Sequence, residues 1–306
     1  MPARTKRSGR LAKRKLSKSR FKFGKSLILL LTIFLVLVGL LFAFFFKTSF
    51  WGRGERLGLA YTTTTGDIAV SNFDPKLMVI STIIIPKDTE VEVSRSLGKW
   101  RIGALYQLGE NEKLGGVLLS ETITRYLKMP AEAWTSGDAP LTSWLEPIRT
   151  NLSLSDRISI SIFSLVARPG SQTTIEAVSA GYLKKSRLSD GKLGYVRALE
   201  TLPFEISTVF ADPDISREGL RIEIENRTGS KGIASKLGEI VEVMGAKIFS
   251  LEVGEKDDSD CSIFGKRSIT RNRLSKIFSC KTYEKSKEQG NFDLIIQIGT
   301  GFARRY

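Results

Sequence analysis

Histidine is absent from the 306 residues of this chain. That absence excludes Ser-His-Asp and Cys-His nucleophile systems and most zinc chemistry. Cysteine is almost absent, with only Cys261 and Cys280, and two thiols are too few for a metal cage. In an oxidising environment the two could pair. Any catalysis must therefore use carboxylates, Lys, Arg, Tyr or a hard metal ion.

An uninterrupted apolar run without charge occupies residues 26–46, between Lys25 and Lys47. As a helix it would be roughly 30 Å long, which matches the hydrocarbon thickness of a bilayer. A core helix would be shorter and keep a polar face, and a secretory signal would end in small residues rather than in three phenylalanines. Phe50 and Trp51 follow, where they can sit at the headgroup level. The sequence therefore predicts one uncleaved transmembrane helix.

The surplus of positive charge lies before this run. Residues 1–25 hold eleven Lys or Arg and no acid, whereas the rest of the chain holds 36 basic and 32 acidic side chains. By the positive-inside rule such a tail stays in the cytoplasm, where it can adhere to anionic lipid, and the body lies outside. A tail that binds nucleic acid is the alternative, but it offers only Phe21 and Phe23 for stacking. We expect membrane lipid as a partner and no nucleic acid.

The first segments of the body indicate mixed α and β structure. Residues 52–58 are expected to form a polar connector. Residues 66–73 and 77–85 alternate like strands on either side of an Asp-Pro-Lys turn, which predicts a hairpin. A third strand is expected over 89–93, and apolar residues at helical spacing predict a helix within 115–129.

Short motifs in this region carry a resemblance. They are Gly66-Asp67-Ile68 at a strand start, Asp74-Pro75 at a turn, IPKDTEVEV over 85–93, Trp100-Arg101-Ile102-Gly103-Ala104-Leu105-Tyr106, and Gly115-Gly116 before a helix. Through them the chain, from about residue 60 to 130, resembles the LytR-CpsA-Psr family, most distinctively in the IPxDT motif. Known members are membrane-anchored with the body outside, and they transfer anionic glycopolymers from polyprenyl pyrophosphate carriers to peptidoglycan.

The resemblance implies a pyrophosphate site made of arginines, with acidic residues for a divalent cation. The candidates in this chain are Lys87, Asp88, Arg101 and Arg125, with Asp88 as the ligand of Mg2+ if the chain is a transferase. The chain departs from the family in having Lys87 for an arginine and Gly103 for an asparagine, and it lacks the closing R-x-x-R-Q-Q stretch. Lysine keeps the charge but loses the bidentate fork. Alternatively, this loop is only a solvated strand break.

Residues 131–210 give no clear prediction. The apolar side chains of 152–170 fit neither the helical nor the strand period, so both stay open. The mixed stretches from 172 to 210 suggest a shortened second half of the first domain, or a loosely packed connector. An Asp-Pro-Asp sequence at 212–214 marks the boundary of the next unit.

The last unit alternates strands and helices. Strands are expected over 221–226, 246–253, 261–264 and 292–298, and helices over 233–244 and 268–278. The first of these helices has apolar residues at i, i+4, i+7, i+8 and i+11 and ends at Gly245. This alternation predicts an α/β layer with a partly parallel sheet.

The same unit, about residues 215–306, carries a second resemblance. It contains Asn226-Arg227-Thr228-Gly229-Ser230-Lys231-Gly232-Ile233-Ala234, then Gly245, then Asp293-Leu294-Ile295-Ile296-Gln297-Ile298-Gly299. This pattern is similar to that of the LytR C-terminal domain. Thr300 and Gly301 follow where the family often has an aspartate, which weakens any metal site there.

The turn between strand and helix in this unit has two interpretations. Thr228, Gly229, Lys231 and Gly232 could hold a phosphate through backbone amides, the helix dipole and the lysine charge. Alternatively, the glycines serve only backbone angles and close packing, since neither G-x-G-x-x-G nor a Walker sequence is present.

The two cysteines also leave alternatives. Cys261 opens an expected strand and Cys280 follows the helix that returns toward it, so a disulfide could close a loop of about twenty residues. Two buried free thiols that behave as small hydrophobic side chains are the other possibility.

These features together predict an α/β protein. It would consist of a basic cytoplasmic tail (1–25), a transmembrane helix (26–46), a reduced LytR-CpsA-Psr-like domain with a connector (60–210) and a small α/β LytR C-terminal-like domain (215–306). We expect an envelope protein outside the cell membrane that binds cell-wall glycopolymer or an envelope protein, without catalysis or cofactor. The alternative is a phosphotransferase that attaches lipid-pyrophosphate-linked glycopolymers to peptidoglycan.

Overall fold

The computed structural model describes residues 23–47, 51, 54–137, 149–284 and 291–306. The chain divides into two compact units, residues 1–47 and 48–306. The predicted boundary between residues 210 and 215 lies inside the second unit. The basic tail predicted for 1–25 lies outside the described residues except at its end.

The first unit contains helix α1, Phe23–Lys47. Its described side chains, those of residues 27–40, are exposed throughout. Among the residues that the structure describes, no helix is both long enough and apolar enough to cross a membrane. The span over residues 26–46 stays a prediction from the sequence.

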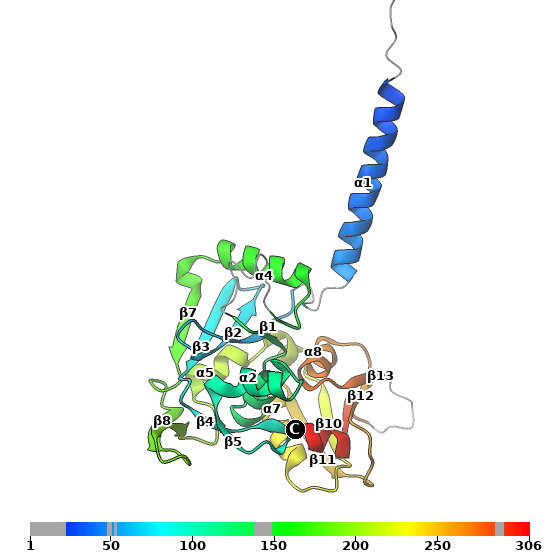
Figure 1. The fold of residues 1–306 in the computed structure, drawn as a ribbon. Helices are drawn as coiled ribbons and strands as arrows, with labels where there is room; N and C mark the ends of the chain where they lie inside the picture. Colours follow the sequence, from blue (N-terminus) through cyan, green and yellow to red (C-terminus); the bar gives the residue numbers. More distant parts are fainter. Residues whose placement is uncertain (1–22, 48–50, 52–53, 138–148, 285–290) are drawn as a thin grey trace, which may run out of the picture. The chain divides into compact units, whose positions relative to one another are not determined.

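The second unit begins with a mixed five-stranded sheet in the order β6-β1-β2-β3-β7 (Figure 1). Its members are β1 (Leu57–Thr62), β2 (Ile68–Asp74), β3 (Val79–Ile85), β6 (Ala133–Thr135) and β7 (Gln172–Glu176). The three central strands pair antiparallel, and the two short outer strands are parallel to their neighbours.

The predicted hairpin is confirmed by the pairing of β2 with β3. The Asp74 carboxylate accepts hydrogen bonds of 3.0 Å from the amides of Lys76 and Leu77 and so shapes the turn. The polar connector predicted for 52–58 is wrong at its end, because β1 begins at Leu57 and is buried along almost its whole length. Leu57 and Gly58, the last two residues of the predicted connector, already pair with β2 as part of the sheet.

Helices cover both faces of this sheet (Figure 1). On one face lie α2 (Leu105–Asn111), which the sequence did not predict, and α3 (Val117–Tyr126), which corresponds to the helix predicted within 115–129. On the other face, Ile160 and Phe163 of α4 (Leu154–Val166) pack into a second core with Leu59 and Phe73. The sheet is therefore buried on both sides, and β2 is buried at every position.

Residues 152–170, whose apolar pattern fits neither the helical nor the strand period, contain the helix α4. Ser153 begins the helix as its N-cap, and Asp156 completes a capping box by bonding back to the Ser153 amide. The pattern is ambiguous because apolar residues occur on both sides of the helix. Ile160 and Phe163 face the core, whereas Ile162 and Leu165 are exposed.

Residues 177–210 pack into the core between the first sheet and α3. The hairpin of β8 (Leu183–Arg187) and β9 (Leu193–Arg197) is followed by α5 (Phe204–Phe210). Tyr182 and Ile206 are fully buried in the same cluster as α3. The interpretation of this region as a loosely packed connector is therefore wrong.

The C-terminal part contains the second five-stranded sheet, in the order β11-β10-β14-β12-β13. Its strands are β10 (Arg221–Asn226), β11 (Lys247–Val253), β12 (Cys261–Gly265), β13 (Lys281–Tyr283) and β14 (Leu294–Ile298). Its helices are α6 (Pro213–Glu218), α7 (Ile233–Val243), α8 (Ile269–Phe278) and α9 (Thr300–Arg305). Only the β12–β14 pair is antiparallel, so the predicted partly parallel sheet is confirmed.

Short elements complete the second unit. They are β4 (Glu90–Glu92), which pairs with β5 (Lys99–Arg101), and the 3-10 turns Ser94–Ser96, Ile102–Ala104 and Pro169–Ser171. The strand predicted over residues 89–93 corresponds to β4.

A buried ionic cluster joins the two sheet regions. Arg273 of α8 donates to Asp212 Oδ2 at 2.6 Å and to Glu132 Oε1 at 3.3 Å. Asp212 caps α6, and Glu132 directly precedes β6. All three side chains are at most 3% exposed. Because each charge is desolvated, the cluster fixes the contact between the two regions.

Candidate functional site

Lys87 and Asp88 lie in a turn over residues 86–89, which follows β3. The Lys87 amide donates to Asp67 Oδ1 at 2.9 Å, and the Lys87 Nζ donates to the carbonyl of Thr65 at 3.1 Å. The lysine therefore contacts the loop between β1 and β2. The Asp88 carboxylate instead meets a guanidinium on the other side of the turn.

Arg101, at the end of β5, pairs with two carboxylates. Its Nη1 contacts Asp88, and its Nη2 lies 2.9 Å from Asp190 Oδ2. Hydrogen bonds to Asp190 and Asp88 raise the pKa of Arg101 above its ordinary value. The pKa of Asp190 is lowered, first by a hydrogen bond from the Lys192 amide and then by Arg101. The guanidinium is thus shared between two acids.

The predicted residues Lys87, Asp88 and Arg101 therefore lie around one turn. Asp190 completes the group, and sequence reasoning missed it because it lies in the β8–β9 turn, in the stretch that gave no prediction. Nothing local marks this aspartate as a partner of Arg101.

Gly103, where the family has an asparagine, lies against this turn. The Gly103 amide donates to the Lys87 carbonyl at 3.0 Å. A Cβ at position 103 would come within 2.7 Å of the Lys87 Cβ. The glycine therefore allows the turn to approach closely, and any side chain there would displace Lys87.

Arg125 lies apart from the other candidates, beyond the opposite end of β4. Its Nη2 lies 3.1 Å from Glu92 Oε1, and its Nη1 donates to the Val93 carbonyl at 3.4 Å. The structure therefore does not bring Arg125 into contact with Asp88 or Arg101.

Arg125 lines a cleft of about 320 Å³ between α3, β9 and α7. Four cations and three carboxylates line it: Arg125, Lys128, Arg197, Lys236, Glu92, Glu200 and Glu239. Lys128 Nζ lies 2.7 Å from Glu239 Oε2 and so links the segment after α3 to α7, and Arg197 Nη2 lies 2.7 Å from Glu200. Burial raises the pKa of Tyr126, over whose ring the Arg197 guanidinium lies at 4.7 Å. Such a lining suits a polar group rather than an apolar lipid chain.

The residues around Asp88 do not fit a magnesium site. The nearest partner of its carboxylate is the Arg101 guanidinium, which opposes a second cation. Within the described residues no group of three or more His, Cys, Asp or Glu side chains could hold a metal ion. No catalytic step through Mg2+ follows from these residues.

The turn at 226–232 is organised by its own side chains. Asn226 Oδ1 accepts from the Thr228 amide at 3.0 Å and from its hydroxyl at 2.6 Å, and the Thr228 hydroxyl accepts from the Ser230 amide at 3.0 Å. Gly229 and Gly232 have φ of 74° and 85°, which favour glycine. The amide of Thr228, one of the candidate phosphate ligands, and that of its neighbour Ser230 are therefore already used within the turn. Hydrogen bonds within the turn explain the presence of Thr228, and the positive φ angles explain the two glycines. Lys231 is exposed.

No protein-family model and no curated protein matches the chain. Among solved structures, Bacillus subtilis TagV is similar with a TM-score of 0.36 at 11% identity, over 47% of this chain and 91% of TagV. Bacillus subtilis TagT gives 0.36 at 11% identity, over 49% and 88%, and TagT has also been solved bound to LIIa-WTA. A transcriptional regulator from Enterococcus faecalis gives 0.36 at 10% identity, over 63% and 89%.

These likenesses cover between 47% and 63% of this chain. At these identities and scores the likeness does not bear on activity or ligand. It does not show a LytR C-terminal domain, so the resemblance of residues 215–306 stays a prediction from the sequence.

Proposed function

We propose that the chain is a membrane-anchored envelope protein whose body lies outside the cytoplasm and binds cell-wall polymer or an envelope partner without catalysis. The proposal rests on the observation that two of the candidate cations already pair with carboxylates. Arg101 is shared by Asp88 and Asp190, and Arg125 is paired with Glu92. A pyrophosphate would have to compete with carboxylates that already neutralise both guanidinium groups.

A phosphotransferase is the second candidate. The observation in its favour is that Lys87, Asp88 and Arg101 surround one turn, as a pyrophosphate site would require. In that case Lys87 would contact a phosphate oxygen, and the ligand would displace one of the two acids from Arg101.

We expect the full-length protein to sediment with purified peptidoglycan and to transfer no glycopolymer from a polyprenyl pyrophosphate carrier, with or without Mg2+. In a transferase, Lys87→Ala would weaken carrier binding about tenfold or more, the scale of one charge-assisted contact. Lys185→Ala, an exposed lysine of β8, is the matched control. Transfer by the wild type that is lost in Lys87→Ala and kept in Lys185→Ala would contradict the non-catalytic function.

The membrane topology follows from the apolar run 26–46 and the eleven basic residues before it. Protease added to spheroplasts should digest the body and leave a cytoplasmic marker protein intact. If the body survives until the membrane is broken, the topology is wrong.

A further inference from the structure

Helix α4 has an apolar stripe on its solvent side. Five exposed residues form it, with exposed fractions from 38% to 72%: Leu154, Ile158, Ile162, Leu165 and Val166. They recur at spacings of three and four residues and so follow one side of the helix. The core side of α4 is filled separately by Ile160 and Phe163. The stripe is therefore not needed to pack the helix onto the sheet.

No charged side chain interrupts the stripe. Of the two charged residues within α4, Asp156 is buried at the N-terminal cap and Arg157 is half-buried. The next charge is Arg168, which is exposed just beyond the end of the helix. An exposed apolar face without charge can enter a membrane interface, where binding strengthens with the apolar area buried and with attraction of a flanking arginine to anionic lipid.

Trp51 connects α4 to the end of the apolar run that the sequence predicts to span the membrane. The Trp51 amide donates to Asp156 Oδ1 at 2.9 Å, and its ring packs edge-on against Phe163, with 6.0 Å between the ring centroids. Trp51 comes only five residues after Phe46, the last residue of the apolar run. Five extended residues reach at most about 18 Å, so a run that spans the bilayer requires α4 near the bilayer surface.

We infer that the outer surface of the lipid bilayer covers the apolar stripe of α4. The inference rests on the proposed membrane anchor and deepens it. The stripe would enter roughly 5–10 Å, to the boundary of headgroups and acyl chains, with Trp51 at the headgroup level and Arg168 near anionic lipid. The body is then held in one orientation on the membrane.

The test uses the full-length chain in vesicles of phosphatidylglycerol and phosphatidylethanolamine. Ile162→Cys and Leu165→Cys carry an environment-sensitive dye, and the native cysteines do not react while they are joined in a disulfide. Phe204→Cys is the control, because Phe204 is 81% exposed on α5, which packs against the opposite face of the first sheet. Dyes at 162 and 165 should shift to the blue and be quenched by lipids with a nitroxide high in the acyl chain, whereas the dye at 204 should not.

Flotation of the same vesicles separates the two proposals. If the chain does not float with the vesicles, both the anchor and the covering of α4 are wrong. If it floats while the dyes at 162 and 165 are quenched no more than the dye at 204, only the inference about α4 is overturned. Dyes that are shielded from water yet not quenched by nitroxide lipids would indicate a second copy of the chain on α4, and would overturn the inference as well.

Discussion

Replacing Arg273 with methionine is expected to lower the free energy of unfolding by about 3–5 kcal/mol. The guanidinium lies 2.6 Å from Asp212 and 3.3 Å from Glu132, and all three side chains are almost completely buried. Methionine fills similar space but removes the cation, so two carboxylates would remain desolvated without it. The loss reflects this uncompensated charge more than the strength of the pair.

Urea unfolding of Arg273→Met and of the wild type measures the effect. Arg221→Met is the matched control, because Arg221 pairs with Asp293 at 3.2 Å while both side chains are about half exposed. For such a pair we expect a change below about 1 kcal/mol. Equal and small losses in the two variants would show that the buried cluster is not stabilising.

The loss of unfolding free energy in Arg273→Met should depend on pH, because it depends on whether Glu132 is ionised. Burial raises the pKa of Glu132, and the attraction of Arg273 only partly offsets it. Without the arginine the pKa rises further, so the folded state of the variant resists ionisation of this carboxyl more strongly. A carboxyl whose folded pKa exceeds its unfolded pKa costs stability above both values, and the cost disappears as pH falls through the folded pKa to the ordinary value of 4.5. The difference between variant and wild type should therefore shrink on acidification.

Most elements of residues 221–298 were readable from the sequence, and β10 and α7 show why, because each is covered on one side. In β10, Ile222 and Ile224 face the core while Arg221 is exposed, so the strand alternates as a half-buried strand should. Helix α7 has a single apolar stripe for the same reason. Local pattern and tertiary environment agree here.

The first sheet and α4 are harder to read because burial or apolar surface occurs on two sides. Strand β1 is buried on both faces, and the sequence placed its start in a polar connector. Helix α4 has apolar residues toward the core and toward solvent, which removes the period on which a helix prediction depends.

The charged sites show a different limit. Lys87, Asp88 and Arg101 could be picked out because the family resemblance covers the short region of the chain that holds them. Arg273, Glu132 and Asp212 come from three distant segments, and each resembles an ordinary surface charge in its local sequence. Only the packing of α8 against the first sheet region brings them together, which no local pattern encodes.

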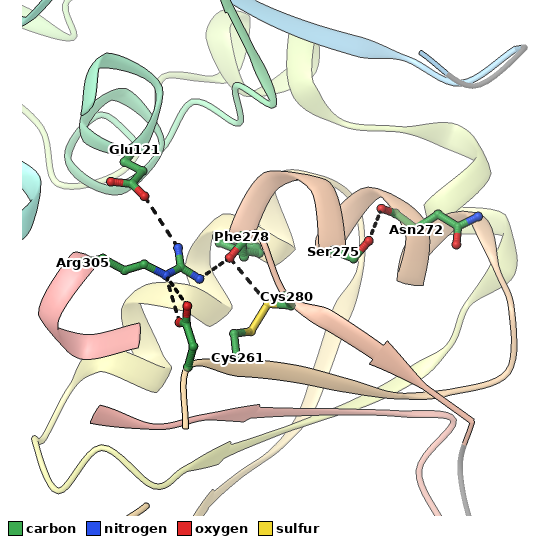
Figure 2. The surroundings of a disulfide bond; sticks show 8 residues. Glu121, Cys261, Asn272, Ser275, Phe278, Cys280 and Arg305 are labelled. Atoms are coloured by element: carbon green, nitrogen blue, oxygen red, sulfur yellow. Dashed lines mark hydrogen bonds and ion pairs between the residues drawn. A yellow bond between two sulfur atoms is a disulfide. The ribbon is translucent and has the colours of Figure 1, made fainter. Parts of the chain in front are cut away.

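Loss of the Cys261–Cys280 disulfide is expected to lower the free energy of unfolding by about 3 kcal/mol. The bond joins the start of β12 to the residue before β13, beside Phe278 at the end of α8 (Figure 2). The Cα atoms are 4.6 Å apart and the residues are 19 positions apart in the sequence. In the chain-entropy model, closing a loop of this size restricts the unfolded chain and so stabilises the folded one.

The variant with Cys261→Ala and Cys280→Ala separates the bond from its surroundings. Both cysteines are buried, so alanine avoids burying a new hydroxyl group. A reducing agent should destabilise the wild type by nearly the full amount and leave the double variant unchanged, because the chain has no other cysteine. Thiol labelling of the unfolded, unreduced wild type should find no reactive thiol. Two reactive thiols would mean that the cysteines act as buried apolar side chains, and reduction would then have no effect on stability.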